Sequence, residues 1–173
     1  MKRLLVVVDY QKDFINGSLG FDGAEAIEDN IIKLINDFEN SGDDIVFTFD
    51  EHDDDYMNTV EGKNLPILHC IKNSKGYEVS DKLKPLLKNY PTFSKPSFGS
   101  FSLGEYIKNH EYNEIYLCGL VSDICVFSNA IIAKSASSTK TEIYVCKNAT
   151  SSNDLKMQEK SFEMLAHLHI NVK

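Results

Sequence analysis

The chain has 173 residues, of which 42% are hydrophobic and 25% charged, and its formal net charge is -8. A chain of this length buries about 70% of its unfolded surface, so we expect one domain over residues 1–173. The acidic balance excludes an extended surface for nucleic acid or anionic membranes, which needs clustered Lys and Arg. No apolar run approaches the roughly 20 residues of a membrane helix, and Leu4–Val8 is too short for a signal peptide. We therefore expect no membrane association and a cytoplasmic location.

Predicted strands and helices alternate along the chain. Strand-length apolar runs, continuous rather than alternating, indicate strands buried on both faces. Between them, apolar residues recur at steps of three and four, which is typical of amphipathic helices. In chain order the predicted elements are strand Leu4–Val8, helix 27–38, strand Ile45–Phe49, strand Ile115–Cys118, helix 124–132, strand Ile143–Cys146, helix 155–168 and a weaker strand His169–Val172. This order predicts an α/β fold with a mainly parallel sheet and helices on both faces.

The carboxyl ends of the predicted strands are where chemistry is expected. Ligands of open parallel sheets bind outside these ends, so the polar residues that follow each strand should converge. Asp9 follows the first strand, Asp50 the second, and residues 119–125 the third. The stretch Glu51–Tyr77 is long for a loop and begins acidic, and loops of this length in compact domains are usually functional or disordered.

The four cysteines lie far apart and form no CxxC pair: Cys70, Cys118, Cys125 and Cys146. In a reducing compartment we expect free thiols, so at least one of them can have a chemical role, and each is judged by its surroundings. Cys118 and Cys146 fall in predicted strands, which indicates a structural role. For Cys70, beside His69, the structural role is favoured but both remain open.

Cys125 is the strongest nucleophile candidate. Ser122 is a good N-cap, which puts Cys125 in the first helical turn, where the helix dipole and a nearby cation would lower the thiol pKa. Gly119 permits a tight turn whose N–H groups can face an oxyanion. The helix alone, however, favours a small buried cysteine.

Two further residues suit proton transfer and charge stabilisation. Asp9 ends an apolar strand, where burial would raise its pKa and suit it to carrying a proton, although a turn aspartate is an equal alternative. Lys95 is a lone lysine among aromatic residues, followed by a proline that favours an extended backbone. A surface lysine is the alternative.

A divalent metal site is predicted at the second strand. Asp50 and His52 point the same way on an extended segment, and with His69 they form a set that suits zinc, iron or manganese. Glu61 is a possible fourth ligand. The spacing alone is weak evidence because the loop is generally acidic. We interpret the remaining histidines as non-ligands: His110, His167 and His169.

Taken together, five segments resemble the nicotinamidase/isochorismatase-like cysteine hydrolases over nearly the whole chain. Val8–Phe14 is similar to the family's Asp-x-Gln-x-Asp-Phe opening, and Phe47–His52 to the segment that supplies an aspartate and a histidine to the metal. Leu65–Gly76 is similar to the Trp-Pro-x-His-Cys-Val stretch, Lys95 matches the family lysine, and Gly119–Val126 matches the nucleophile motif. Each match alone is weak, but all five in order are specific.

The resemblance implies a three-layer α/β/α Rossmann-like fold with about six strands, and an amidase in NAD salvage. It implies a triad in which Cys125 attacks the amide carbon, Asp9 carries the proton and Lys95 favours the thiolate. A cis peptide would join Leu120 and Val121, and the N–H groups of Val121 and Cys125 would hold the oxyanion. The metal would anchor a pyridine nitrogen. Small-molecule amide substrates and a homo-oligomer are also implied.

Departures from the family pattern concern the substrate. The family tryptophan is absent and Leu65 takes its place, although the aromatic Phe14 remains. Phe98 or Phe101 can reshape the pocket. A related hydrolase acting on a carbamoyl or ureido compound is therefore the alternative to nicotinamide deamidation. A non-catalytic flavodoxin-like nucleotide-binding module is a remote third reading, because the turn after the first strand lacks a glycine-rich phosphate cradle.

Overall fold

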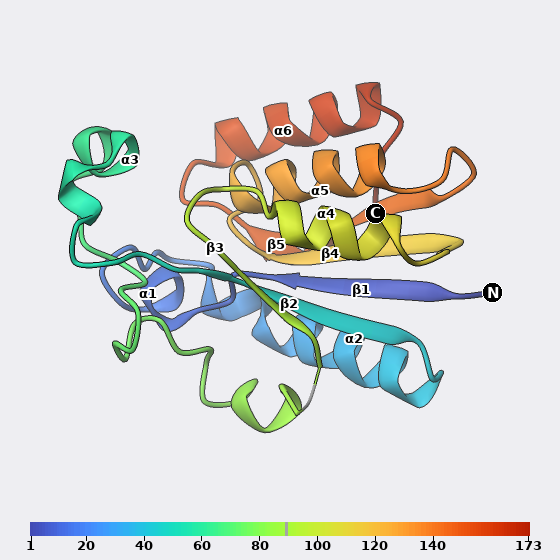
Figure 1. Ribbon diagram of the computed structural model, residues 1–173, viewed down its shortest axis with the longest axis horizontal. Coiled ribbons are helices and arrows are strands. Elements are labelled where there is room, and N and C mark those ends of the chain that lie inside the picture. The colour runs from blue at the N-terminus through green and yellow to red at the C-terminus, as the bar shows by residue number, and fades with distance from the viewer. Residues whose placement is uncertain (89) are drawn as a thin grey trace.

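The computed structural model describes residues 1–88 and 90–173 and shows a six-stranded sheet between two layers of helices (Figure 1). All neighbouring strands are parallel, in the order β3-β2-β1-β4-β5-β6. The strands are β1 (Arg3–Val8), β2 (Asp44–Asp50), β3 (Thr92–Lys95), β4 (Glu114–Leu120), β5 (Glu142–Ser151) and β6 (Asn171–Val172). The predicted α/β/α fold is confirmed.

The helices divide between the two faces of the sheet. Helix α2 (Glu28–Asn40) covers one face, and α4 (Phe101–Lys108), α5 (Cys125–Ala136) and α6 (Leu155–His167) cover the other (Figure 1). Two short helices, α1 (Lys12–Ile15) and α3 (Val60–Asn64), lie at the carboxyl end of the sheet. Within the described residues, no helix combines the length and apolar character needed to cross a bilayer.

Strand β1 shows how the sheet separates two apolar layers. Leu5 and Val7 pack into the cluster formed with α2, whereas Leu4, Val6 and Val8 pack into the cluster formed with α4, α5 and α6. All five side chains are fully buried. Because successive side chains of a strand point to opposite faces, a continuous apolar run is required at this central position.

Strand β3 and helix α4 escape sequence prediction, as do the short helices α1 and α3. Strand β3 is a four-residue edge strand with three polar residues, so it carries no apolar run. Helix α4 begins after Ser100, whose Oγ accepts a hydrogen bond from Leu103 N, and it contains Gly104 packed closely against Ile132 of α5. Both β3 and α4 depend on tertiary contacts more than on local pattern.

The strand order reverses between β1 and β4, and the carboxyl edge there opens as a crevice. Gly119 pairs with Val8 across this point with φ of +110°, and a Cβ on Gly119 would lie 1.9 Å from the Val8 carbonyl oxygen. Only glycine therefore allows β4 to approach β1 so closely just before the loop that leads to Cys125.

Candidate active site

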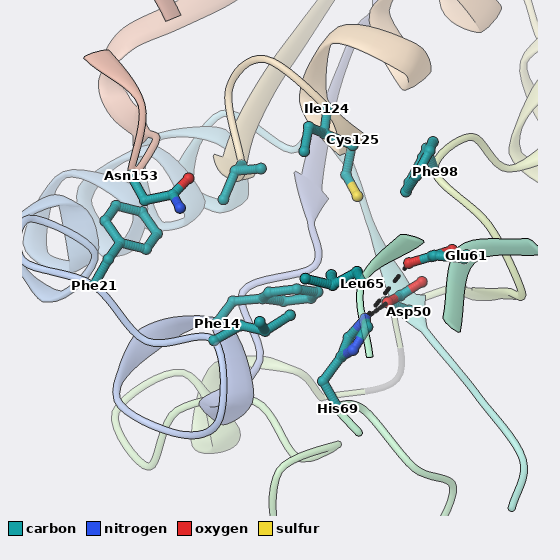
Figure 2. A pocket seen from close by; sticks show the side chains of 12 residues that line it. Phe14, Phe21, Asp50, Glu61, Leu65, His69, Phe98, Ile124, Cys125 and Asn153 are labelled. Carbon is teal, nitrogen blue, oxygen red and sulfur yellow. Dashed lines mark ion pairs between the residues drawn. The ribbon is translucent and has the colours of Figure 1, made fainter. Parts of the chain in front are cut away.

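A pocket of about 190 Å³ lies at this carboxyl edge (Figure 2). Its lining includes predicted residues from distant segments: Phe14, Asp50, Glu61, Leu65, His69, Phe98, Val121 and Cys125. Four further residues were not predicted from the sequence: Leu19, Phe21, Ile124 and Asn153. Phe98 thus reaches the pocket, whereas Phe101 is 86% exposed and does not line it.

Lys95 is the centre of a buried charge cluster. Its Nζ lies 2.6 Å from Asp9 Oδ2, 3.3 Å from Asp50 Oδ1 and 3.6 Å from Cys125 Sγ. The register of β2 and β3 pairs Asp50 with Lys95 directly, which explains their contact. Burial lowers the pKa of Lys95, but the surrounding anions outweigh this and raise it above its usual value, which favours the charged ammonium.

Asp9 is held at the end of β1 by polar neighbours. Thr48 Oγ1 donates a 2.6 Å hydrogen bond to Asp9 Oδ1. Oδ2 forms the ion pair with Lys95 but makes no angularly well-formed hydrogen bond among the described residues. Burial raises the pKa of Asp9, and Lys95 opposes that rise. The free acceptor capacity of Oδ2 and the raised pKa suit Asp9 to receiving a proton.

Cys125 is the first residue of α5, as expected, but its local setting differs from the prediction. Ile124 occupies the N-cap position, whereas Ser122 Oγ donates to Gln158 Oε1, so the predicted Ser122 cap is wrong. The expected lowering of the thiol pKa is also wrong, because burial raises it well above the usual value and Lys95 only partly compensates. The resting thiol therefore needs a base to lose its proton.

The loop before Cys125 contains the expected cis peptide bond between Leu120 and Val121. The carbonyl oxygen of Val121 accepts hydrogen bonds from Ile124 N and Val126 N, which folds the loop tightly onto the start of α5. The backbone N–H groups of Val121 and Cys125 make no hydrogen bond with the described residues. Two free donors beside a thiol can stabilise an oxyanion.

Four side chains gather one ligand atom each at the predicted metal site, all within 4.8 Å of one another: Asp50, His52, Glu61 and His69. The imidazole Nε2 atoms lie 3.0 and 3.4 Å from Asp50 Oδ2, and 3.8 and 3.6 Å from Glu61 Oε1. Ligand atoms about 2.1 Å from a divalent cation are themselves roughly 3.0 to 3.4 Å apart. The two Asp50 distances lie in this range and the two Glu61 distances lie above it, so Asp50 and the two imidazoles match such an ion more closely than Glu61 does.

The surroundings of the cluster orient its ligands. His69 Nδ1 lies 2.8 Å from Ile67 O, which directs Nε2 toward the cluster. The buried ring of Tyr56 packs against both imidazoles at 4.6 and 5.0 Å. Burial lowers the pKa of His69, but Asp50 and Glu61 outweigh it and raise it to about 10, which reflects the local excess of negative charge. A cation would neutralise that excess.

Gln11, which follows β1, links this part of the chain to Asp50 of the metal-ligand cluster. Its side-chain amide donates to Asp50 O and accepts from Asp50 N, at 2.9 and 2.8 Å, and also donates to Tyr77 O. The support by Gln11, Tyr56 and Thr48 was not predicted. Gln11 lies in the segment Val8–Phe14 that resembles the family motif, but its hydrogen-bond partners can be identified only from the structure.

The other thiols and histidines lie outside this arrangement. Cys70 is fully buried and its N–H donates to Asp13 Oδ2, which supports the structural interpretation. Cys118 and Cys146 are buried in β4 and β5. In the described part of the chain, no second group of three or more metal-ligating side chains is found.

Comparisons with known proteins place this site in a family. The isochorismatase domain matches residues 3–172. A nicotinamidase structure from Bacillus subtilis is 30% identical, with a TM-score of 0.86 and 99% coverage of both chains. An N-carbamoylsarcosine amidase from Thermoplasma acidophilum is 26% identical, with a TM-score of 0.82 and coverage of 100% of this chain and 96% of that one. A zinc complex of Pyrococcus horikoshii pyrazinamidase, 23% identical, shares the fold with a TM-score of 0.87, over 100% of this chain and 99% of that chain. This chain belongs to the isochorismatase family, among its nicotinamidase-like members.

Proposed function

We propose that this chain is a cysteine-dependent amidohydrolase that deamidates nicotinamide or a closely related aromatic carboxamide. The observation that carries the proposal is that Cys125 and the metal-ligand cluster open on one pocket (Figure 2). A thiol with a buried acid and a buried lysine attacks carbonyl carbon, and the ligand cluster gives the pocket a second point of attachment. The similarity to the Bacillus subtilis nicotinamidase supports the aromatic substrate.

The proposed reaction begins with proton transfer. Asp9 accepts the proton of Cys125, and the ammonium of Lys95 stabilises the thiolate at its 3.6 Å contact. Cys125 Sγ then bonds to the amide carbon while the N–H groups of Val121 and Cys125 hold the oxyanion. Asp9 returns the proton to the leaving nitrogen, which departs as ammonia. Water, deprotonated by Asp9, hydrolyses the thioester and releases the acid.

Asp50, His52, His69 and Glu61 would hold a divalent metal ion, with zinc the first candidate and iron or manganese the alternatives. When bound, the ion supplies a Lewis acid that attracts a ring nitrogen. Phe14 and Leu65 would flank the ring, since both line the pocket and Phe14 packs against His69 at 5.6 Å. These residues orient the carbonyl toward Cys125.

A carbamoyl or ureido substrate is the second candidate. The observation that favours it is Leu65, which gives the pocket an aliphatic wall at the place of the family tryptophan. The likeness to an N-carbamoylsarcosine amidase supports the same alternative. A panel of nicotinamide, pyrazinamide and N-carbamoyl amino acids separates the two.

The test is ammonia release from nicotinamide after incubation of the protein with zinc, iron(II) or manganese, compared between wild type and Cys125→Ala. Cys146→Ala is the matched control, because Cys146 is a buried thiol outside the pocket. We expect release that needs both the metal and Cys125. Release that persists in Cys125→Ala would contradict the mechanism, and no release with wild type would contradict nicotinamide as substrate.

The homo-oligomer and the cytoplasmic location remain predictions. Sedimentation analysis of the purified protein tests the first, and imaging of the tagged protein in its native cell tests the second.

A further inference from the structure

The pocket continues past the nucleophile on the side away from the metal-ligand cluster. The strand order places β2, β1, β4 and β5 next to one another. Asp50 ends β2, Cys125 follows β4, and Asn153 follows β5. Because neighbouring strands lie about 4.8 Å apart and the strand that precedes Cys125 lies between β2 and β5, Asn153 and Asp50 lie on opposite sides of the nucleophile. Figure 2 shows Asn153 and Phe21 at one end of the pocket and the metal ligands at the other.

Asn153 is the only polar residue lining the described pocket that belongs neither to the triad nor to the metal cluster. Its neighbours are fixed in place: Ser152 Oγ accepts from Asp154 N at 3.0 Å, and Asp154 caps α6 through its side chain. The side-chain amide of Asn153 takes no part in these bonds and is exposed. The neutral side-chain amide of Asn153 is therefore available both to donate and to accept hydrogen bonds.

The wall between Asn153 and Cys125 is apolar. Phe21 lies beside Asn153 at this end of the pocket (Figure 2), and Val121 precedes Ser122, whose N–H donates to Ser151 O at the end of β5. An apolar wall that ends in one side-chain amide suits a ligand with a short hydrocarbon chain and a neutral polar group at the end of that chain. That terminal group can be a hydroxyl or a carboxamide, since the asparagine amide both donates and accepts hydrogen bonds.

We propose that Asn153 and Phe21 form a subsite for a substituent on the amide nitrogen of the substrate. This inference rests on the proposed function: with the acyl ring at the metal ligands and the carbonyl at Cys125, the end of the pocket at Phe21 and Asn153 is left for a substituent on the nitrogen, while Asp9 still reaches the nitrogen itself. The substrate class then includes secondary amides whose nitrogen carries a short chain ending in a hydroxyl or carboxamide.

The chemistry needs no co-reactant besides water. Cys125 Sγ forms a bond to the carbonyl carbon, and the carbon–nitrogen bond breaks. The proton that Asp9 took from the thiol passes to the nitrogen, which leaves as a primary amine. Water then hydrolyses the thioester to the carboxylic acid and restores the thiol.

The test measures nicotinate formation by zinc-incubated protein from three substrates: nicotinamide, N-(2-hydroxyethyl)nicotinamide and N-propylnicotinamide. We expect wild type to prefer the hydroxyethyl over the propyl compound by roughly fivefold to tenfold in kcat/KM, as one neutral hydrogen bond gives. Asn153→Leu should abolish or reverse that preference. Asn148→Leu is the matched control, because Asn148 is an exposed residue of β5 outside the pocket, and it should keep the wild-type ratio.

Turnover of nicotinamide without turnover of either secondary amide would overturn the subsite and leave the proposed function standing. An unchanged preference in Asn153→Leu would also overturn it. No nicotinate from nicotinamide itself would overturn the proposed function, and this inference with it.

Discussion

The two halves of the pocket are built in different ways. The triad comes from strand ends, because Asp9 follows β1, Lys95 ends β3, and Cys125 begins the helix after β4. Three of the four metal-site residues come instead from the segment between β2 and β3, with Glu61 on α3. There an isolated bridge pairs His52 with Ile71, and Tyr56 packs against the imidazole of His52. The sheet thus positions the reacting groups, and the segment between β2 and β3 positions the residues that would bind the metal and the ring of the substrate.

The contact between Asp50 and Lys95 joins the two halves, at 3.3 Å. This difference in construction predicts that substitutions in the triad lower both the stability of the protein and kcat. Substitutions of His52, Glu61 or His69 should act mainly by lowering the affinity for the metal.

Lys95→Met should have the largest effect, because it leaves two buried carboxylates without their cation. Removing one partner of a buried ion pair costs about 3–5 kcal/mol of unfolding free energy, and we expect kcat to fall by about a thousandfold or more. Urea unfolding and ammonia release measure the two effects. Lys72→Met is the matched control, because Lys72 pairs with Glu51 at 2.9 Å on the surface. Equal stability losses in both variants would contradict the central role of Lys95.

His69→Ala should lower zinc affinity by at least about a hundredfold, with a smaller change in the stability of the metal-free protein. The reason is that His69 supplies one of the four gathered ligand atoms. Competition with a chromophoric chelator measures the affinity. His110→Ala serves as control, since His110 stacks on Tyr106 away from the site. Unchanged zinc affinity in His69→Ala would show that the cluster is not the metal site.

Thr48→Val should reduce kcat by about fivefold to tenfold, because Asp9 Oδ1 loses one hydrogen bond while the side-chain volume is kept. Thr48→Ser retains the hydroxyl and should recover most of the rate. Steady-state kinetics with both variants tests this. If both variants lose equally, packing rather than the hydrogen bond would explain the loss.

Leu65→Trp should have the smallest effect, a decrease of a few fold in KM for nicotinamide with little change in kcat. An aromatic wall opposite Phe14 would stack on the ring without touching the triad, and such stacking contributes about 0.5–1.5 kcal/mol. The same variant should bind N-carbamoyl compounds no better. A lower KM for those compounds instead would favour the ureido alternative.

The sequence predicts the parts of the site that follow long apolar strands. The ends of β1, β2 and β4 are marked by continuous apolar runs, so Asp9, Asp50 and the position of Cys125 in a first helical turn follow from local pattern. The assignment of Lys95 rests on family resemblance, because the edge strand β3 is too short and polar to be recognised.

Other features depend on tertiary packing. The direction of the Cys125 pKa shift depends on complete burial, which the helix position does not reveal. Tyr56 reaches the site from a short 3-10 helix and Asn153 from a loop, and neither segment has a distinctive sequence spacing. Ser122 satisfies the N-cap pattern, but Gln158 from α6 takes its hydroxyl.

The central claim is that the thiol and the metal cluster hold opposite ends of one molecule, and an aldehyde ligand tests it without turnover. Pyridine-3-carboxaldehyde can add the Cys125 sulfur to its carbonyl carbon, with the thiol proton moving to oxygen, while its ring nitrogen reaches the metal. Calorimetry would compare its Kd for zinc-loaded wild type, Cys125→Ala and His69→Ala, with benzaldehyde as the ligand that lacks the ring nitrogen. We predict that each of these three changes weakens binding by about tenfold or more, the effect of roughly 1.4 kcal/mol. Wild-type affinity in Cys125→Ala, or equal affinity for benzaldehyde, would contradict the account.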